Sequence, residues 1–283
     1  MTGHPPQDRE HPPLPEELFE RLDRAWQTLE DDDPEAAGLE AEKLMGQTGG
    51  HPEVRFLLGA ALLESGDPVA AFEQLRLCDG QVEDRIVHRH YLASALFENH
   101  RFDEAASIFR EIAEAAPDEA MAIYSLAECL EFTGEYEEAE RLFQRAHKLE
   151  PEEFPAPIRM KAEAFREVLA EAIELLPDEL RMHLQKVAIV VEDLPSPEVL
   201  ADEPGDGPLT PTVLGLFYGP SLREQSLLDP AALPPTIFVY QRNLERSCRT
   251  REELVEEIRI TLYHELGHYI GLDEDELEER GLE

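Results

Sequence analysis

The apolar positions in the first half of the chain repeat every 34 residues. Leucine recurs at Leu58, Leu92 and Leu126, and the next position is always small, at Gly59, Ala93 and Ala127. A second set has the same spacing, with alanine at Ala71, Ala105 and Ala139, and a large residue four positions later at Leu75, Phe109 and Phe143. Within each unit the apolar positions follow helical intervals, so the pattern predicts two helices of about a dozen residues, brought close by the small residues.

Turn-forming residues separate these predicted helices. Gly66 and Gly134 mark the turn within a unit, and prolines mark the other turn, as at Pro151. We expect three well-formed units over residues 52–153 and a degenerate capping unit over 18–51. One helical hairpin cannot bury its own apolar face, so the units must stack into an all-α solenoid.

A different pattern follows the last repeat. Residues 158–176 have the spacing of one amphipathic helix that ends before Pro177. Runs rich in β-branched and aromatic residues predict three strands, at 186–193, 213–219 and 235–242. Long connections with proline and glycine separate them, which is typical of a small α+β domain.

A long helix is predicted at the end of the chain. Thr250 and Glu253 have the form of a capping box at its start, and Gly271 can stop it. The expected organisation is therefore a disordered tail over residues 1–15, repeats over 16–153 and an α+β domain over 154–283.

The strongest chemical signal lies at the end of this last helix. His264 and His268 are four residues apart, so their imidazoles lie on one helical face, one turn from each other. This arrangement suits two nitrogen ligands on one zinc ion. Glu265, next to the first histidine, is placed to bond a water held by the metal and to act as its general base.

A carboxylate after Gly271 is expected to be the third ligand. Glu274 lies three residues past the glycine, where metal peptidases with an HExxHxxGxx-ligand pattern place it. Asp273 and Asp275 flank it and remain alternatives. Two histidines and one carboxylate leave the fourth position open for water, as a catalytic zinc site requires.

Other candidates carry weaker signals. Four side chains could donate a hydrogen bond to a tetrahedral oxyanion: Tyr218, Tyr240, Tyr263 and Arg242. Histidines in the repeats, such as His88, are expected at the surface. Arg246 and Arg249 could acidify Cys248 somewhat, but the sequence shows no base partner for it.

Composition excludes some classes of partner. The chain has 283 residues and a net charge of −38, so nucleic acid and an anionic membrane surface would be repelled. No apolar run is long enough for a membrane span, and the N-terminus lacks the apolar core of a signal peptide. The three cysteines form no CxxC pair, which favours a reducing, cytoplasmic location.

Two family resemblances accompany these patterns. The repeats resemble tetratricopeptide repeats, which implies that they bind a protein or peptide on their concave face. The segments 177–197, 214–222, 235–244 and 262–277 resemble the bacterial family of possible zinc metallopeptidases with a minimal zincin fold. That resemblance implies Zn²⁺ held by His264, His268 and Glu274, with Glu265 as base.

Two functions fit the sequence. The first is a zinc-dependent metallopeptidase that hydrolyses peptide bonds through metal-activated water, with the repeats recruiting a protein substrate or partner. The alternative is a non-catalytic interaction scaffold whose zincin domain is vestigial or only binds metal.

Overall fold

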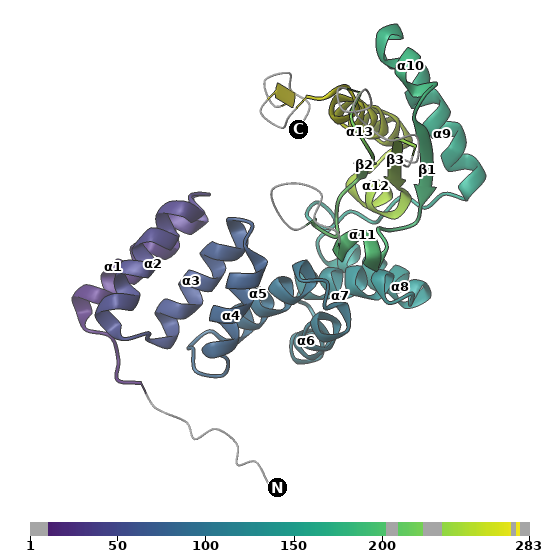
Figure 1. Cartoon of the computed structure of the whole chain (residues 1–283). Coiled ribbons are helices and arrows are strands. Elements are labelled where there is room, and N and C mark those ends of the chain that lie inside the picture. Colours follow the sequence, from purple (N-terminus) through teal and green to yellow (C-terminus); the bar gives the residue numbers. More distant parts are fainter. Residues whose placement is uncertain (1–10, 202–208, 223–233, 273–275, 278–283) are drawn as a thin grey trace, which may run out of the picture. The chain divides into compact units, whose positions relative to one another are not determined.

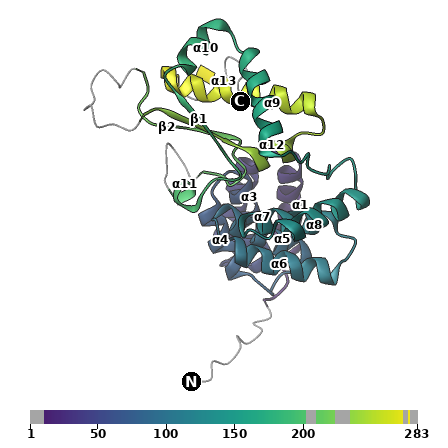
Figure 2. The ribbon, with the colours of Figure 1, turned by 90° about the vertical axis from the view of Figure 1, so that its right-hand side faces the viewer.

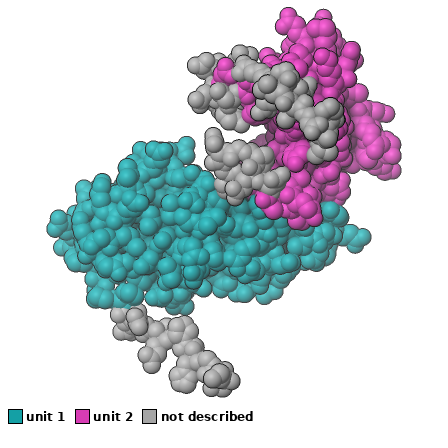
Figure 3. All heavy atoms as spheres, viewed as in Figure 1, with its two compact units in different colours: residues 1–149 teal, residues 150–283 magenta. Residues whose placement is uncertain are grey.

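The computed structural model describes residues 11–201, 209–222, 234–272 and 276–277. The chain divides into two compact units, a first unit of residues 1–149 and a second unit of residues 150–283 (Figure 3). The predicted order, an all-α repeat array followed by a small α+β domain, is confirmed. Most of the tail expected to be disordered, residues 1–10, lies outside the described residues.

The described part of the first unit consists of four antiparallel helical hairpins (Figure 1). Their helices are α1 Glu16–Glu30, α2 Pro34–Thr48, α3 Pro52–Glu64, α4 Pro68–Leu77, α5 Arg85–Glu98, α6 Phe102–Ala115, α7 Ala120–Phe132 and α8 Tyr136–Leu149. Aspartate caps explain several of the helix starts. The side chains of Asp33, Asp67 and Asp84 each accept a hydrogen bond from the backbone N–H three residues later.

The small residues of the 34-residue pattern have a direct packing role. A β-carbon at Gly59 would lie 2.6 Å from Cγ of Leu75, so α3 and α4 approach too closely for any larger residue. His88 was expected at the surface, and this prediction is wrong. It is fully buried, with Nε2 2.9 Å from the carbonyl oxygen of Leu75. Its position on the inner face of α5, which a local pattern does not reveal, accounts for the difference.

The second unit contains a three-stranded sheet and helices (Figure 2). In chain order its described elements are α9 Ala162–Glu174, α10 Asp178–Leu184, β1 Ala188–Glu192, α11 Pro197–Ala201, β2 Gly215–Tyr218, β3 Thr236–Tyr240, α12 Gln241–Ser247 and α13 Arg251–Ile270. Strand β3 is central, parallel to β1 and antiparallel to β2, so β2 is an edge strand.

The core of the second unit lies between this sheet and the two long helices α9 and α13. Buried side chains on α9, such as Phe165, and on α13, such as Ile258 and Leu262, form one cluster with Ile237 and Val239 of β3. Burial of α13 along one stripe leaves its other faces for β2 and for the histidine pair.

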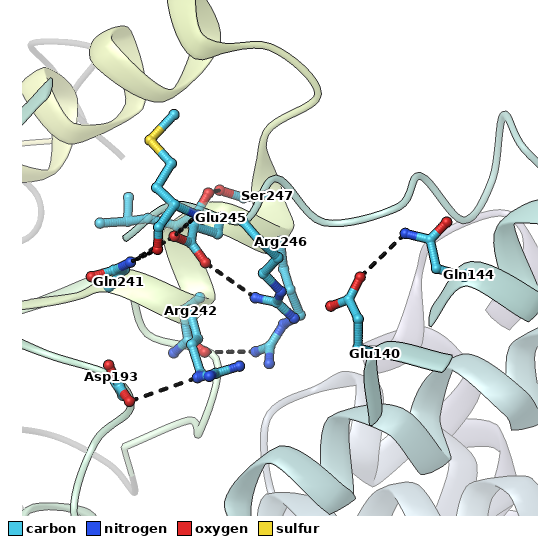
Figure 4. Close-up of polar contacts among 12 residues, drawn as sticks. Glu140, Gln144, Asp193, Gln241, Arg242, Glu245, Arg246 and Ser247 are labelled. Atoms are coloured by element: carbon cyan, nitrogen blue, oxygen red, sulfur yellow. Dashed lines mark hydrogen bonds and ion pairs between the residues drawn. The ribbon is translucent and has the colours of Figure 1, made fainter. Parts of the chain in front are cut away.

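The helix predicted from residue 158 begins four residues later, at Ala162. The backbone N–H groups of Ile158 and Met160 instead donate to the carbonyl and the carboxylate of Glu245 on α12, at 2.9 and 3.0 Å. Gln241 also donates to Glu245, at 2.7 Å (Figure 4). Because α12 binds these amides, the segment stays extended and is anchored to the second unit.

Candidate metal centre

Helix α13 carries the predicted metal-binding motif, and both of its ends are capped. At the start, Oγ1 of Thr250 accepts a hydrogen bond from the N–H of Glu253 at 3.1 Å. The carboxylate of Glu253 reaches back to the N–H of Arg249, one residue earlier than in a regular capping box. These bonds fix where the helix begins, and so fix the turn on which each later side chain lies.

The two histidines converge on one point. His264 and His268 are half-buried, their ring centroids are 4.7 Å apart, and their Nε2 atoms are 2.9 Å apart. Two nitrogens bound to one tetrahedral zinc at about 2.0–2.1 Å lie about 3.3–3.4 Å from each other. A small rotation of the rings opens the observed distance to that value. The imidazole pair therefore fits a zinc ion.

The chain turns sharply directly after this pair. Gly271 adopts a left-handed conformation with φ of 90°, which glycine reaches without steric cost. The N–H of Gly271 donates to the carbonyl of His268, and that of Leu272 donates to the carbonyl of Gly267, both at 3.0 Å. This pair of bonds is a Schellman motif, so the helix stops within one turn of His268, at Ile270.

The chain then returns to the same helix turn. Leu277 is buried, and a β-carbon at Gly267 would lie only 2.4 Å from its Cδ2 atom. The same β-carbon would lie 3.6 Å from Cδ1 of Leu272. Leu272 and Leu277, which flank the predicted third-ligand segment on either side, therefore both pack against Gly267, the residue before His268.

The predicted third ligands, Glu274 and its alternatives Asp273 and Asp275, lie outside the described residues. Within the described part, no three His, Cys, Asp or Glu side chains form a group that could hold a metal. The described donors thus supply two of the three predicted ligands.

Glu265 faces the edge strand. It is only 7% exposed, and its Oε2 atom accepts a hydrogen bond from the N–H of Phe217 at 2.5 Å. Gly215 makes this approach possible, because a β-carbon there would lie 2.5 Å from Cγ2 of Thr261 and 3.3 Å from Cγ of Glu265. Neither contact was predicted from the sequence. The only signal for them was a glycine within the strand predicted at 213–219.

The weaker candidates fall in different environments. Tyr240 is fully buried, and among the described residues its hydroxyl has no hydrogen-bond partner. Burial and the charges of Glu192 and Glu265 raise its pKa. Tyr218 is exposed, Tyr263 packs at the edge of the core, and Arg242 lies 3.8 Å from a carboxylate oxygen of Asp193. Nothing in the described contacts brings these four side chains together.

The surroundings of Cys248 do not acidify it. The thiol is buried, and burial raises its pKa instead of lowering it. The arginines that neighbour Cys248 in the sequence place no positive charge beside its sulfur. Cys248 is a buried core residue.

Comparison with known proteins agrees with both family resemblances. Residues 184–282 match the zincin-like metallopeptidase family, and residues 96–164 match the tetratricopeptide repeat. The chain therefore carries a zincin-like metallopeptidase domain behind tetratricopeptide repeats, as predicted. No curated protein matches the chain.

Every helix in the described part is too short or too polar to span a bilayer.

Similar solved structures cover about half of the chain. MamA (41-end) from Desulfovibrio magneticus RS-1 is 19% identical over 50% of this chain and 79% of its own, with a TM-score of 0.44. YrrB, described as a TPR protein with an unusual peptide-binding site, is 19% identical over 47% of this chain and 69% of its own, with a TM-score of 0.42.

Proposed function

We propose that the protein is a zinc-dependent metallopeptidase whose repeats bind a protein substrate or partner. The observation that carries this proposal is the convergence of His264 and His268 on one helix face, with Nε2 atoms 2.9 Å apart, beside the buried carboxylate of Glu265. The match of residues 184–282 to the zincin-like metallopeptidase family supports the reaction class.

In this proposal His264, His268 and Glu274 hold the zinc ion. The return of the chain at Leu277, beside Gly267, supports a ligand from the segment between Gly271 and Leu277. When bound, zinc would act as a Lewis acid and lower the pKa of water at the open position.

Glu265 is the proposed general base. It takes a proton from the attacking water and returns it to the leaving amine nitrogen. The hydrogen bond from the Phe217 N–H restrains its carboxylate at the edge of β2, one residue from the first zinc ligand. The role of this bond is to keep the proton acceptor in place while the substrate binds.

The repeats, proposed to span residues 16–153, have a separate role. Tetratricopeptide repeats stack into extended surfaces that suit a protein or peptide partner. The proposed peptidase domain, residues 154–283, is small, so recruitment by the array would supply affinity that its own surface lacks.

Metal content and hydrolysis test this function together. Purified wild-type protein is expected to contain about one zinc by mass spectrometry and to cleave an unfolded casein substrate. The His264→Ala/His268→Ala variant should lose both, whereas Glu265→Gln should keep the metal and lose hydrolysis. Equal, negligible zinc in wild type and the double variant would overturn the metal site, and full activity of Glu265→Gln would overturn the assigned base.

Two single substitutions test which carboxylate is the third ligand. Glu274→Gln should weaken zinc binding strongly, while Asp273→Asn should leave it nearly unchanged. The reverse order would assign Asp273 as the ligand. Zinc binding without any hydrolysis would favour the non-catalytic scaffold.

A further inference from the structure

Three glutamates occupy the same position in successive repeats. Glu30, Glu64 and Glu98 occur at 34-residue intervals and are the last residues of α1, α3 and α5 (Figure 1). Helix α1 contacts α3, and α3 contacts α5, so equivalent positions lie along one edge of the first unit, named here the glutamate edge.

This placement is electrostatically unfavourable for the helices themselves. The C-terminus of a helix carries a partial negative charge, which favours lysine or arginine in the last turn and disfavours glutamate. None of the three helices has a basic residue in its last turn. Among the described residues, neither Glu30 nor Glu64 forms an ion pair, and several basic side chains of this unit, such as Arg21 and Arg89, pair with other carboxylates.

Aromatic rings lie beside these carboxylates. Trp26 is one turn before Glu30 on α1 and therefore shares its face. Its ring centroid is 6.3 Å from that of Tyr91, and both rings are half-buried, so part of each remains accessible. Phe56 packs behind them, 4.8 Å from Trp26 and 5.9 Å from Tyr91.

The tyrosine hydroxyl connects the rings to the glutamates. It donates to Oε1 of Glu64 at 2.7 Å. Burial, this hydrogen bond and the charges of Glu64 and Glu30 raise the pKa of Tyr91, so both carboxylates act on the same hydroxyl. The result is a partly exposed aromatic surface with two carboxylates that lack a cation.

We propose that Trp26, Tyr91, Glu30 and Glu64 bind a lysine or arginine side chain of a protein partner, carried on a basic segment that follows the glutamate edge toward Glu98. This inference rests on the recruiting role proposed above for the repeats. A cation over a tryptophan face gains from the ring quadrupole, and carboxylates give it charge-assisted hydrogen bonds. The chain's net charge of −38 would also attract a basic partner over longer distances.

The only tryptophan in the sequence, Trp26, gives a direct readout. The full chain would be titrated with an acetylated nine-residue peptide that carries three lysines among glycines and serines. A peptide with glutamine in place of lysine is the ligand control. The lysine peptide should change Trp26 emission saturably, and the glutamine peptide should not.

Matched variants separate the site from general attraction. The Glu30→Gln/Glu64→Gln variant should bind the lysine peptide with an affinity that is lower by about tenfold or more. Glu42→Gln/Glu114→Gln removes two exposed carboxylates from α2 and α6, and so the same charge, but should bind like the wild type. Unchanged Trp26 emission at saturating peptide, or equal weakening in both double variants, would overturn the site.

This experiment does not depend on the metal site. His264→Ala/His268→Ala should bind the lysine peptide with wild-type affinity. Hydrolysis without a Trp26 response would overturn only the basic-segment site, and a Trp26 response without zinc or hydrolysis would overturn only the peptidase.

Discussion

Glu265 shows how a single side chain depends on neighbours that are distant in sequence. Its carboxylate is nearly buried, and the hydrogen bond that restrains it comes from Phe217, 48 residues earlier. Gly215 lets β2 lie close enough for that bond to form. The position of the proposed base is therefore set as much by the edge strand as by helix α13.

Gly215→Ala should disturb this arrangement. The added methyl group would overlap Thr261 and press on Glu265, so we expect a loss of about 1–3 kcal/mol in stability and a larger fall in hydrolysis than in zinc content. Calorimetry and a casein assay measure these effects. Gly46→Ala is the control, because that helical position is open and alanine should stabilise it. Unchanged hydrolysis in Gly215→Ala would show that β2 does not position the base.

His88 makes the stability of the first unit depend on pH. Burial lowers the pKa of this imidazole in the folded state, whereas the unfolded chain has the ordinary value of about 6.5. As the pH falls through that value, the unfolded state takes up a proton that the folded state does not. The contribution of the neutral ring is therefore complete above that pH and is lost below it.

Urea unfolding followed by Trp26 fluorescence tests this expectation. From pH 7.5 to 5.5 the wild type should lose stability relative to His88→Gln, by at most about 1.4 kcal/mol per pH unit. Glutamine can still donate to the carbonyl of Leu75 but does not titrate in this range. Parallel pH profiles for the two proteins would contradict the assignment.

Helix α13 carries both core-packing side chains and the side chains of the candidate metal site. Its apolar stripe faces the core, while the histidine pair lies on another face and Glu265 on the flank toward β2. Both ends are fixed, by Thr250 at the start and Gly271 at the end. The helix thus holds the two proposed ligands and the proposed base in a defined register.

Gly271→Ala should weaken both the fold and the metal site. Alanine in the left-handed conformation costs about 1–2 kcal/mol, and the turn would shift the segment that is proposed to supply the third ligand. Gly271→Asn is the matched control, since asparagine tolerates this conformation better. Zinc competition titrations should rank wild type above the asparagine variant and that variant above alanine. Equal affinity in all three would separate the turn from the metal site.

At the scale of the whole molecule, each unit has its own core. One buried cluster joins α9, β3 and α13, and three others lie within the repeats. Separate cores allow each unit to unfold as its own cooperative block.

Zinc should therefore stabilise one unit and not the other. At a free zinc concentration 100 times the Kd, the second unit should gain about 2.7 kcal/mol. The transition reported by Trp26, in the first unit, should not move. Calorimetry and fluorescence on the same sample would separate the two, with His264→Ala/His268→Ala as the control. A zinc-dependent shift of the Trp26 transition would show that the units unfold together.

The strands and helices predicted from the sequence match the structure where local residue patterns determine them. The strands predicted at 186–193 and 213–219 contain β1 and β2, and the strand predicted at 235–242 contains β3. The short helices α10, α11 and α12 were not predicted from the sequence, and the predicted start of α9 was four residues too early. The later start of α9 traces to Glu245, which is buried and binds a segment more than 80 residues earlier in the chain. No local propensity encodes such a pairing.

Three features follow from the sequence without the structure: a 34-residue helical repeat, a small α+β domain and two histidines one helical turn apart. These features depend on intervals of a few residues, which helix and strand geometry fix directly. The tertiary structure alone decided that Phe217 restrains Glu265, that Gly215 makes room for it and that Leu277 returns to Gly267. Such contacts join distant segments and depend on how complete elements pack, so they exist only in the folded chain.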